Sequence, residues 1–234
     1  MPSDISPATL WTPTNLAQIL GDFRSAVLSY NPYAYWRHGE ASGTVMKDET
    51  RLHHGVYTTA PTLAVAGMIV GDRATCATYA AASSQYATPP NYVDPGGDVT
   101  ILALVSKAAA GLALIIDFAG DNTWLGMDAG GLAKFTVPVN KGATGANIAD
   151  GNPHLVVGTL SGTNVTCGVD GVLGTPVTGA AAHAAAAWSG VGTYIGKHSG
   201  GYYWNGRISD VAIITGLALT AAQQLELWKI ARAL

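Results

Sequence analysis

Charged residues are scarce in this sequence. Only 12% of the 234 residues are Asp, Glu, Lys or Arg, against roughly 25% in typical soluble domains. The 12 Lys and Arg residues are scattered and the net charge is −3, so no basic stripe is present that could neutralise a row of phosphates. We therefore expect no nucleic-acid partner. A surface built mainly from Ala, Gly, Ser and Thr indicates either burial in a larger assembly or a genome that favours Ala and Gly codons.

Long apolar runs and paired cysteines are also lacking. No segment approaches the roughly 18 consecutive apolar residues of a membrane-spanning helix. The N-terminus lacks the positive and then apolar pattern of a signal peptide. The sequence therefore predicts neither membrane insertion nor signal-peptide export. Cys76 and Cys167 lie far apart in apolar, β-branched surroundings without metal-ligand spacing, which favours buried free thiols over a disulfide.

Two segments carry helix signals, one near each end of the chain. The first helix is predicted to follow Thr14 and Asn15, because apolar residues then recur at three- and four-residue steps through Leu28. The second begins with Thr220 and Gln223, which form a capping-box pattern ahead of an apolar helical face. No segment has the composition of a linker. We therefore expect an N-terminal arm over residues 1–22 and one domain over residues 23–234.

Between these helices the sequence has the texture of an all-β protein. Short runs rich in Val, Ile, Thr and Tyr are separated by Gly, Pro, Asn and Asp clusters at intervals of about 8 to 12 residues, which is typical of a sandwich. Asp170-Gly171 predicts a two-residue hairpin turn. The predicted strands are Tyr33–His38, Val56–Thr59, Ala74–Tyr79, Val99–Ser106, Leu112–Phe118, Trp124–Met127, Ala133–Val137, Leu155–Leu160, Val165–Val169, Thr193–Gly196 and Gly206–Ile214.

The last predicted strand alternates in polarity. Alternation predicts that its successive side chains face opposite sides of the sheet. One face would carry Ile208, Asp210 and Ala212, and the other Ser209, Val211 and Ile213.

Three motifs together indicate a family. The first is Tyr35-Trp36-Arg37 followed by Gly39-Glu40, the second is Val169-Asp170-Gly171, and the third is Trp204-Asn205-Gly206-Arg207-Ile208. In this order, within roughly residues 23 to 232, they resemble the LamG-like jelly-roll domains of the concanavalin A-like lectin/glucanase superfamily. The resemblance implies an antiparallel jelly-roll β-sandwich with a short N-terminal helix and a C-terminal helix.

The same resemblance implies a structural calcium site. Relatives place carboxylates at the positions of Glu40, Asp48 and Asp210, and calcium prefers several oxygen ligands. Ser209 stands where the family pattern has an Asp, which weakens the calcium hypothesis. The alternative is that Glu40 and Asp210 bond backbone amides or nearby arginines such as Arg37. The expected cofactor is therefore none, with structural calcium as the alternative.

The sequence lacks the patterns of a hydrolase. A glycosidase needs two carboxylates about 5 to 10 Å apart, yet no Glu-x-Asp-x-Glu run is present and the 15 acidic residues are mostly single. Gly-x-Ser-x-Gly is also absent. We therefore expect no catalytic residues, and a glycoside hydrolase is a remote alternative.

Aromatic residues in the Gly-rich stretch before the last strand form a candidate carbohydrate-binding surface, because sugars stack on exposed aromatic faces. The candidates are Trp188, Tyr194, Tyr202 and Tyr203. Trp36, Trp204 and Trp228 occupy positions where relatives have core aromatics, whereas Trp124 fits either role. His183 lies in a small-residue loop and is predicted to be solvent-exposed.

The functional hypothesis must reconcile a usually extracellular family with the predicted lack of a signal peptide. Structural proteins of tailed phages meet both conditions, and the sequence resembles them in its Tyr-Trp-Arg-x-Gly-Glu opening, short N-terminal extension and low charge. The leading hypothesis is a non-enzymatic virion structural protein, a head decoration or tail-associated subunit. It would be made in the host cytoplasm, be exposed on the virion surface, form a homo-oligomer, and bind neighbouring capsid or tail subunits and glycans. The alternative is a carbohydrate-binding module or lectin with a calcium-dependent site.

Overall fold

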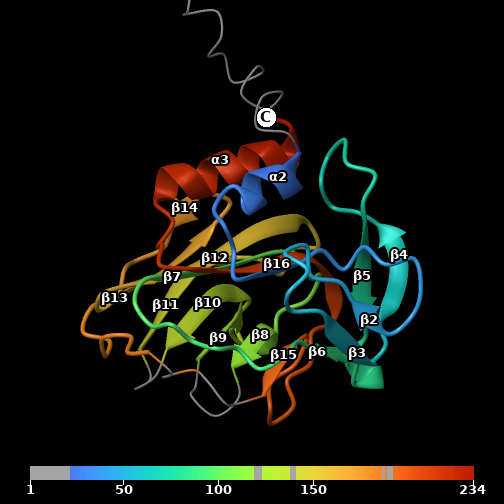
Figure 1. The fold of residues 1–234 in the computed structure, drawn as a ribbon, viewed down its shortest axis with the longest axis horizontal. Helices are drawn as coiled ribbons and strands as arrows, with labels where there is room; N and C mark the ends of the chain where they lie inside the picture. Colours follow the sequence, from blue (N-terminus) through green and yellow to red (C-terminus); the bar gives the residue numbers. More distant parts are fainter. Residues whose placement is uncertain (1–21, 119–122, 138–140, 186–187, 189–191) are drawn as a thin grey trace, which may run out of the picture.

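The chain folds as two antiparallel β-sheets packed face to face (Figure 1). The computed structural model describes residues 22–118, 123–137, 141–185, 188 and 192–234. Sheet A has the strand order β14-β13-β12-β7-β16-β5-β4, with β1 paired to β16, and sheet B has the order β11-β10-β9-β8-β15-β6-β3-β2. The predicted all-β sandwich is therefore confirmed.

Sheet A consists of β1 (Ala34–Trp36), β4 (Thr62–Ala66), β5 (Thr75–Tyr79), β7 (Val99–Ser106), β12 (Pro153–Ser161), β13 (Asn164–Val169), β14 (Val172–Leu173) and β16 (Gly206–Thr215). Sheet B consists of β2 (Val45–Met46), β3 (Gly55–Thr59), β6 (Tyr86–Thr88), β8 (Ala113–Phe118), β9 (Thr123–Met127), β10 (Leu132–Val137), β11 (Lys141–Asn147) and β15 (Thr193–Ile195). A 3₁₀ turn, η2 (Ala81–Ser83), precedes β6.

The main core lies between the two sheets. Alternate side chains of each strand point inward, as the two-residue period of a strand requires, and large residues such as Trp204 and Phe135 are fully buried there. Gly158 on β12 shows how closely the sheets approach, because an added Cβ would lie 2.4 Å from Cγ of Phe135 on β10. The predicted core roles of Trp36 and Trp204 are confirmed.

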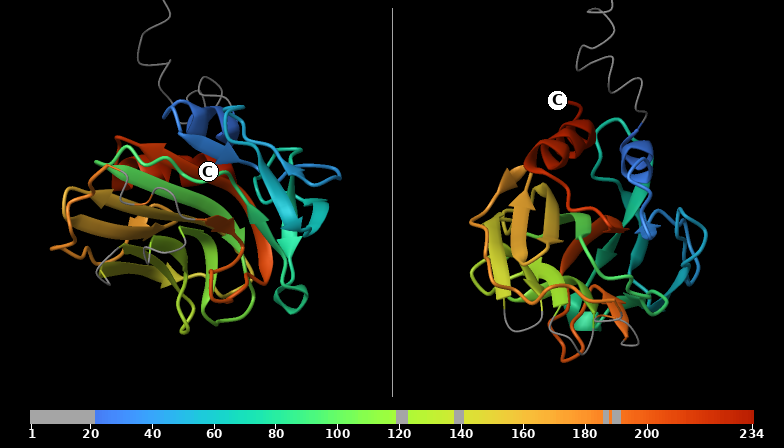
Figure 2. Two further views of the ribbon diagram at one scale, coloured as in Figure 1. Left: turned by 60° about the horizontal axis from the view of Figure 1, so that its bottom comes forward. Right: turned by 60° about the vertical axis from the view of Figure 1, so that its left-hand side comes forward.

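The outer face of sheet A is covered by the two helices, α2 (Phe23–Leu28) and α3 (Ala221–Arg232). Figure 1 and the right-hand view of Figure 2 show the helices side by side over this sheet. Asp22 caps α2, and the predicted capping box of Thr220 and Gln223 is present at α3. Trp228 packs here, partly buried. No helix in the described part of the chain has the length and apolarity needed to cross a bilayer.

Several local predictions can be compared with the structure. The turn at Asp170-Gly171 is confirmed, since both residues have positive φ and join β13 to β14, and both cysteines are buried free thiols. The structure describes the first predicted helix from Phe23 to Leu28, and the earlier part of the prediction lies outside the described residues. Strands β2, β4, β6, β11 and β14 were not predicted, because they are short or, in β11, rich in Gly and Ala.

The alternation predicted for the last strand is only partly right. The pairing of β16 with β7 shifts register between Ser209 and Ala212, and Asp210 has a φ of 55°. This bulge places one extra residue in β16. As a result Ile208 shares the inter-sheet core with Val211, whereas Ala212 faces the helices.

Candidate functional site

Asp48 organises a turn. Its carboxylate accepts hydrogen bonds from the backbone N–H groups of Tyr35 and His53, each at 2.8 Å, and of Leu52 at 3.1 Å. The Thr50 hydroxyl donates to the same group. Burial alone would raise the pKa of Asp48, but the hydrogen bonds from Thr50, Tyr35 and His53 lower it below its usual range. The oxygens that a cation would need are therefore already engaged.

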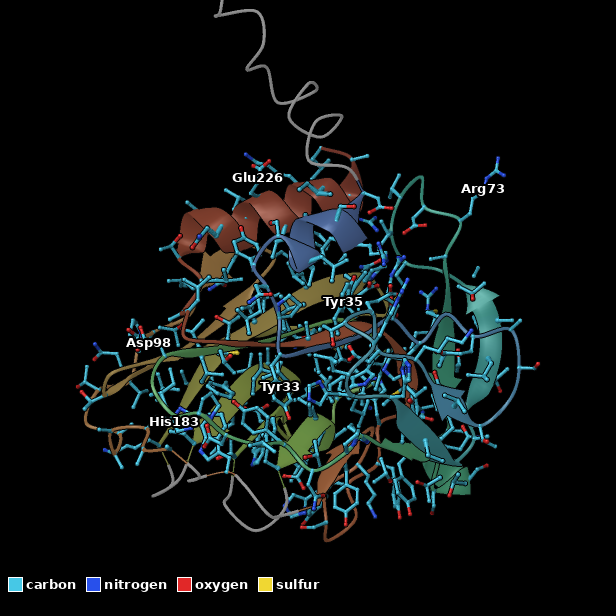
Figure 3. All side chains as sticks on the ribbon, viewed as in Figure 1. Tyr33, Tyr35, Arg73, Asp98, His183 and Glu226 are labelled. Atoms are coloured by element: carbon cyan, nitrogen blue, oxygen red, sulfur yellow. The ribbon has the colours of Figure 1, made fainter. Side chains whose placement is uncertain are left out.

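Asp210 is buried in a second network. Arg37 donates from Nε to Asp210 Oδ1 at 3.0 Å and from a terminal nitrogen to Asp72 Oδ2 at 2.6 Å. The hydroxyls of Tyr35 and Ser209 also donate to Asp210. Figure 3 shows Tyr35 near the centre of the molecule, below α2. Burial raises the pKa of Asp210, and the adjacent Arg37 guanidinium opposes that rise.

Glu40 accepts hydrogen bonds from a third group of donors. Its carboxylate accepts the backbone N–H of Lys47 at 2.7 Å and the hydroxyl of Tyr57 at 2.6 Å. Within the described residues, no group of three His, Cys, Asp or Glu side chains is arranged to hold a metal ion. The structure thus does not assemble the calcium site predicted from Glu40, Asp48 and Asp210. The alternative, bonding to backbone amides and arginine, matches the observed contacts of Glu40 and Asp210.

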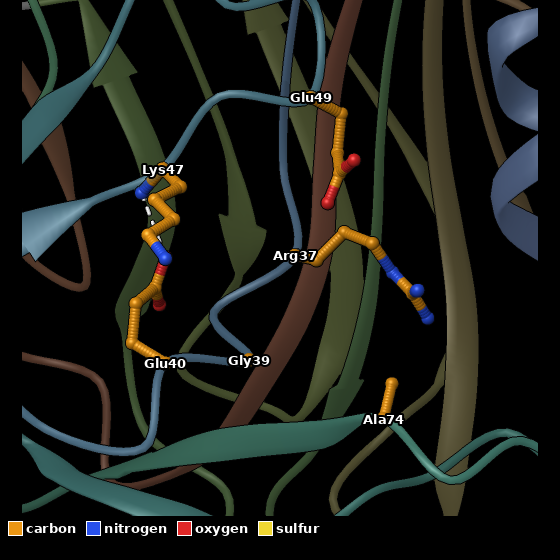
Figure 4. A pocket seen from close by; sticks show the side chains of 6 residues that line it. All are labelled: Arg37, Gly39, Glu40, Lys47, Glu49 and Ala74. Carbon is orange, nitrogen blue, oxygen red and sulfur yellow. Dashed lines mark hydrogen bonds between the residues drawn. The ribbon is translucent and has the colours of Figure 1, made fainter.

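A polar pocket of about 180 Å³ lies beside these networks. It is lined by Arg37, Gly39, Glu40, Lys47, Glu49 and Ala74 (Figure 4). Glu40 reaches toward Lys47 on one wall, and Arg37 and Glu49 extend from another. Their charges are largely compensated, because Arg37 pairs with Asp72 and Asp210, and Glu49 pairs with Arg24 at 2.6 Å. This pocket therefore has little charge left to attract a ligand.

Trp188 does not lie on the surface, which contradicts its predicted role in carbohydrate binding. The residue is 1% exposed, and its ring packs against Phe118, Tyr92 and His183. His183 was predicted to be exposed, but its side chain is only 2% exposed, with Nε2 2.8 Å from Asp94 Oδ2. Figure 3 shows His183 on the side of the molecule away from the helices. The loop folds back onto the sandwich because Asp94 also accepts the Trp188 backbone N–H, at 2.9 Å.

The other predicted aromatic residues are accessible. Tyr194 and Tyr203 are half-buried and lie beside Tyr86, with ring centroids 6.0 Å and 6.5 Å from that of Tyr86. The ammonium group of Lys197 lies 4.0 Å from the ring centroid of Tyr86 and 4.2 Å from that of Tyr194. Tyr202, 53% exposed, packs on His198 in the adjoining hairpin.

Strand pairing extends this aromatic group into a row across sheet B. Asp117 on β8 pairs with Trp124 on β9 and with Tyr194 on β15. Their strand neighbours Phe118, Leu125 and Ile195 point into the core, so Trp124, Asp117 and Tyr194 point outward on the opposite face. Both rings are half-buried. We call Trp124, Asp117, Tyr194 and Tyr86 the aromatic row.

Asp117 is the polar centre of the aromatic row. It is buried under the hairpin that follows β15, and Ser199 donates its backbone N–H to Oδ2 at 3.0 Å. Burial raises the pKa of the Asp117 carboxyl, while the Ser199 hydrogen bond and the nearby side chains of His198 and Lys197 oppose that rise. The two half-buried rings that flank Asp117 can stack on the faces of a sugar, whereas the buried Asp117 carboxyl holds the backbone of the hairpin.

Sequence reasoning identified Tyr194 but missed Asp117, Tyr86 and Lys197, and left Trp124 undecided. Part of the site could be predicted from alternation along a strand. Asp117 lies between the core residues Ile116 and Phe118, so its side chain is expected on the opposite, outer face of the sheet. The register that aligns three separate strands could not be found from the sequence.

Comparison with known families identifies one match. Residues 81–223, more than half of the chain, match the Laminin_G_3 family, described as the concanavalin A-like lectin/glucanases superfamily. Among curated proteins, none matches this chain.

Solved structures share the fold at low sequence identity. Domain 4 of AbnA, a GH43 extracellular arabinanase from Geobacillus stearothermophilus, in complex with arabinotriose, superposes with a TM-score of 0.64 at 15% identity, covering 84% of this chain and 97% of that one. Trypanosoma rangeli sialidase gives 0.56 at 15% identity, covering 84% of this chain and 32% of the sialidase. The binding domain of Paraclostridial Mosquitocidal Protein 1 gives 0.63 at 9%, covering 86% and 52%. At these identities the likeness shows the fold alone.

Proposed function

This chain belongs to the concanavalin A-like lectin/glucanases superfamily, and we propose that it is a non-catalytic glycan-binding domain whose binding surface is the aromatic row. The observation that carries the proposal is the outward alignment of Trp124, Asp117 and Tyr194 on adjacent strands. The outer face of sheet A is covered by α2 and α3, so sheet B is the sheet whose outer face presents such side chains.

The chemistry of the aromatic row suits a sugar. Aromatic rings offer apolar faces to the C–H groups of a sugar ring. Trp124 and Tyr194 are two strand spacings apart, roughly 10 Å, which leaves room for more than one sugar unit. The arabinanase domain solved with arabinotriose supports the proposal by showing a similar fold with a trisaccharide.

We propose binding without hydrolysis because a glycosidase needs a second carboxylate at a defined separation. Among the described residues, the ionisable groups that influence the pKa of Asp117 are His198 and Lys197, and neither is a carboxyl group. Release of reducing sugar from a polysaccharide that the domain binds would overturn this part of the proposal.

Loss of either ring should weaken glycan binding. Trp124→Ala and Tyr194→Ala are each expected to lower affinity about tenfold, because each removes a stacking surface without removing core packing. Affinity electrophoresis in gels that contain arabinan, xylan, β-glucan or pectate would identify a ligand, and calorimetry would measure the change. Trp228→Ala, on the helix-covered side, is the matched control and should bind like the unchanged protein. Failure of the unchanged protein to bind any of these polymers, or equal binding by all variants, would contradict the proposal.

We also propose that the domain is a subunit of a larger assembly, in keeping with the predicted virion role. The supporting observation is an apolar edge. Strand β14 is the outermost strand of sheet A and carries Val172, 68% exposed, and Leu173. Leu225 on α3 is also exposed, and it packs against the turn at Gly171. Unpaired strand edges readily pair with another chain.

The assembly proposal predicts a concentration-dependent oligomer. Light scattering after size exclusion should detect a defined oligomer of the full chain, and Val172→Lys should weaken it, since a charge at a strand edge opposes pairing. Deletion of residues 1–22 tests, in the same experiment, whether the N-terminal arm contributes to the oligomer. A full-length chain that remains monomeric at high concentration would refute the assembly proposal. Virion location itself stays a prediction.

A further inference from the structure

Two lysine side chains lie over rings of the aromatic row, one toward each end. Lys197 lies against both Tyr86 and Tyr194, and Lys134 on β10 lies with its Nζ 5.7 Å from the ring centroid of Trp124. Both lysines are half-buried. A cation over an aromatic face is held by the ring quadrupole, so both ammonium groups are positioned before any ligand arrives.

These ammonium groups make no salt bridge among the described residues, although Lys197 lies close enough to the Asp117 carboxyl to lower its pKa. Neither forms an ion pair there, although Arg24, Arg37 and several histidines do. Asp117, the carboxyl group of the row, is 1% exposed and accepts the Ser199 backbone N–H at 3.0 Å. His198 adds a further group that can carry positive charge. The two lysines therefore place positive charge on the described part of this face, in a protein whose net charge is −3.

We propose that the ligand of the aromatic row is an anionic polysaccharide, with Lys134 and Lys197 binding its acidic groups. This inference rests on the proposed glycan-binding function. Lys134 lies on β10 and Lys197 follows β15, and the strands β9 and β8 lie between them. The two lysines are therefore three strand spacings apart, roughly 14 Å. A single acidic sugar is too short to contact both lysines, so the ligand carries acidic groups on more than one unit.

The position of Lys197 distinguishes an acidic ligand from a neutral one. Its ammonium covers the ring faces of Tyr86 and Tyr194. A neutral sugar would have to displace the ammonium before stacking there. An acidic sugar instead pairs with the ammonium where it lies and stacks on Trp124. The shared chemistry is a row of carboxylate or sulfate groups along a sugar chain.

Paired polymers test this inference. Polygalacturonate carries a carboxylate on each unit and its methyl ester is neutral, and dextran sulfate has neutral dextran as its counterpart. The unchanged protein should bind one acidic polymer about tenfold more tightly than its neutral counterpart, and raising salt from about 50 mM to about 500 mM should remove most of that preference. The acidic polymer that binds identifies carboxylate or sulfate as the recognised group.

Substitution of the two lysines tests whether they cause the preference for the acidic polymer. The double variant Lys134→Gln with Lys197→Gln should lose about tenfold in affinity for the acidic polymer and lose no affinity for the neutral one. Lys229→Gln on α3 is the control and should change neither. Equal binding of acidic and neutral polymers, with both sensitive to Trp124→Ala, would overturn this inference and leave the glycan-binding proposal standing. Binding of no polymer, or binding insensitive to Trp124→Ala, would overturn both.

Discussion

Replacing Arg37 by methionine is expected to lower the free energy of unfolding by about 3–5 kcal/mol, the usual cost of removing one partner of a buried ion pair. Methionine keeps most of the aliphatic volume of Arg37, so the loss in the free energy of unfolding measures the effect of removing the charge. The Asp210 side chain is 1% exposed, and in the variant its carboxyl group would lose the guanidinium that lies 3.0 Å away. The hydroxyls of Tyr35 and Ser209 would remain as its donors. Urea unfolding followed by tryptophan fluorescence measures the difference.

Arg24→Met is the matched control for this prediction. Arg24 and Glu49 form an ion pair at 2.6 Å, but their side chains are 39% and 24% exposed. Exposed pairs contribute about 0–1 kcal/mol, so this variant should remain close to the unchanged protein. Equal losses for Arg24→Met and Arg37→Met would show that burial of Asp210 is not what makes Arg37 important.

The Arg37 variant should also respond to pH. Burial raises the pKa of Asp210, and Arg37 opposes that rise, so without Arg37 the folded protein takes up a proton on Asp210 more readily. A carboxyl whose folded pKa is raised stabilises the fold in its protonated form, and that contribution is lost as pH rises through the folded pKa. The gap in stability between Arg37→Met and the unchanged protein should therefore narrow as pH falls from neutrality toward about 4, near the unfolded pKa of Asp.

Local chemistry explains which parts of the fold could be predicted. The Asp170-Gly171 turn needs two residues that tolerate positive φ, and the Thr220 capping box needs two side chains at fixed spacing, so both are visible in a short stretch of sequence. Strands β2 and β14 have two residues each and exist because a partner strand lies beside them. Such short strands have no periodicity that a sequence could display.

The candidate site could be predicted only in part, for a related reason. Alternation shows that Asp117 faces away from Phe118, but the alignment of Asp117 with Trp124 and Tyr194 is a property of strand register. The calcium hypothesis placed carboxylates where relatives have them. It did not show that backbone amides, hydroxyls and Arg37 would take up the oxygens of Asp48 and Asp210.

Replacing Trp188 by alanine tests whether a residue assigned from sequence to the surface instead stabilises the core. The change should lower the free energy of unfolding by about 3–5 kcal/mol, as is usual when a buried Trp or Phe is truncated. The ring centroid lies 5.6 Å from that of Phe118 and 4.0 Å from that of His183, on which it stacks, so its removal leaves a cavity between these rings. Trp188→Phe should recover part of the loss because it refills part of that volume.

Tyr202→Ala is the control, because Tyr202 came from the same Gly-rich stretch and is 53% exposed. Its stability should stay within about 0.5 kcal/mol of the unchanged protein. Under conditions where Trp188→Ala remains folded, its glycan affinity should equal that of the unchanged protein, since Trp188 packs in the core and Trp124 and Tyr194 stay in place. A stable Trp188→Ala protein that has lost glycan binding would return Trp188 to the binding surface and contradict the buried position described above.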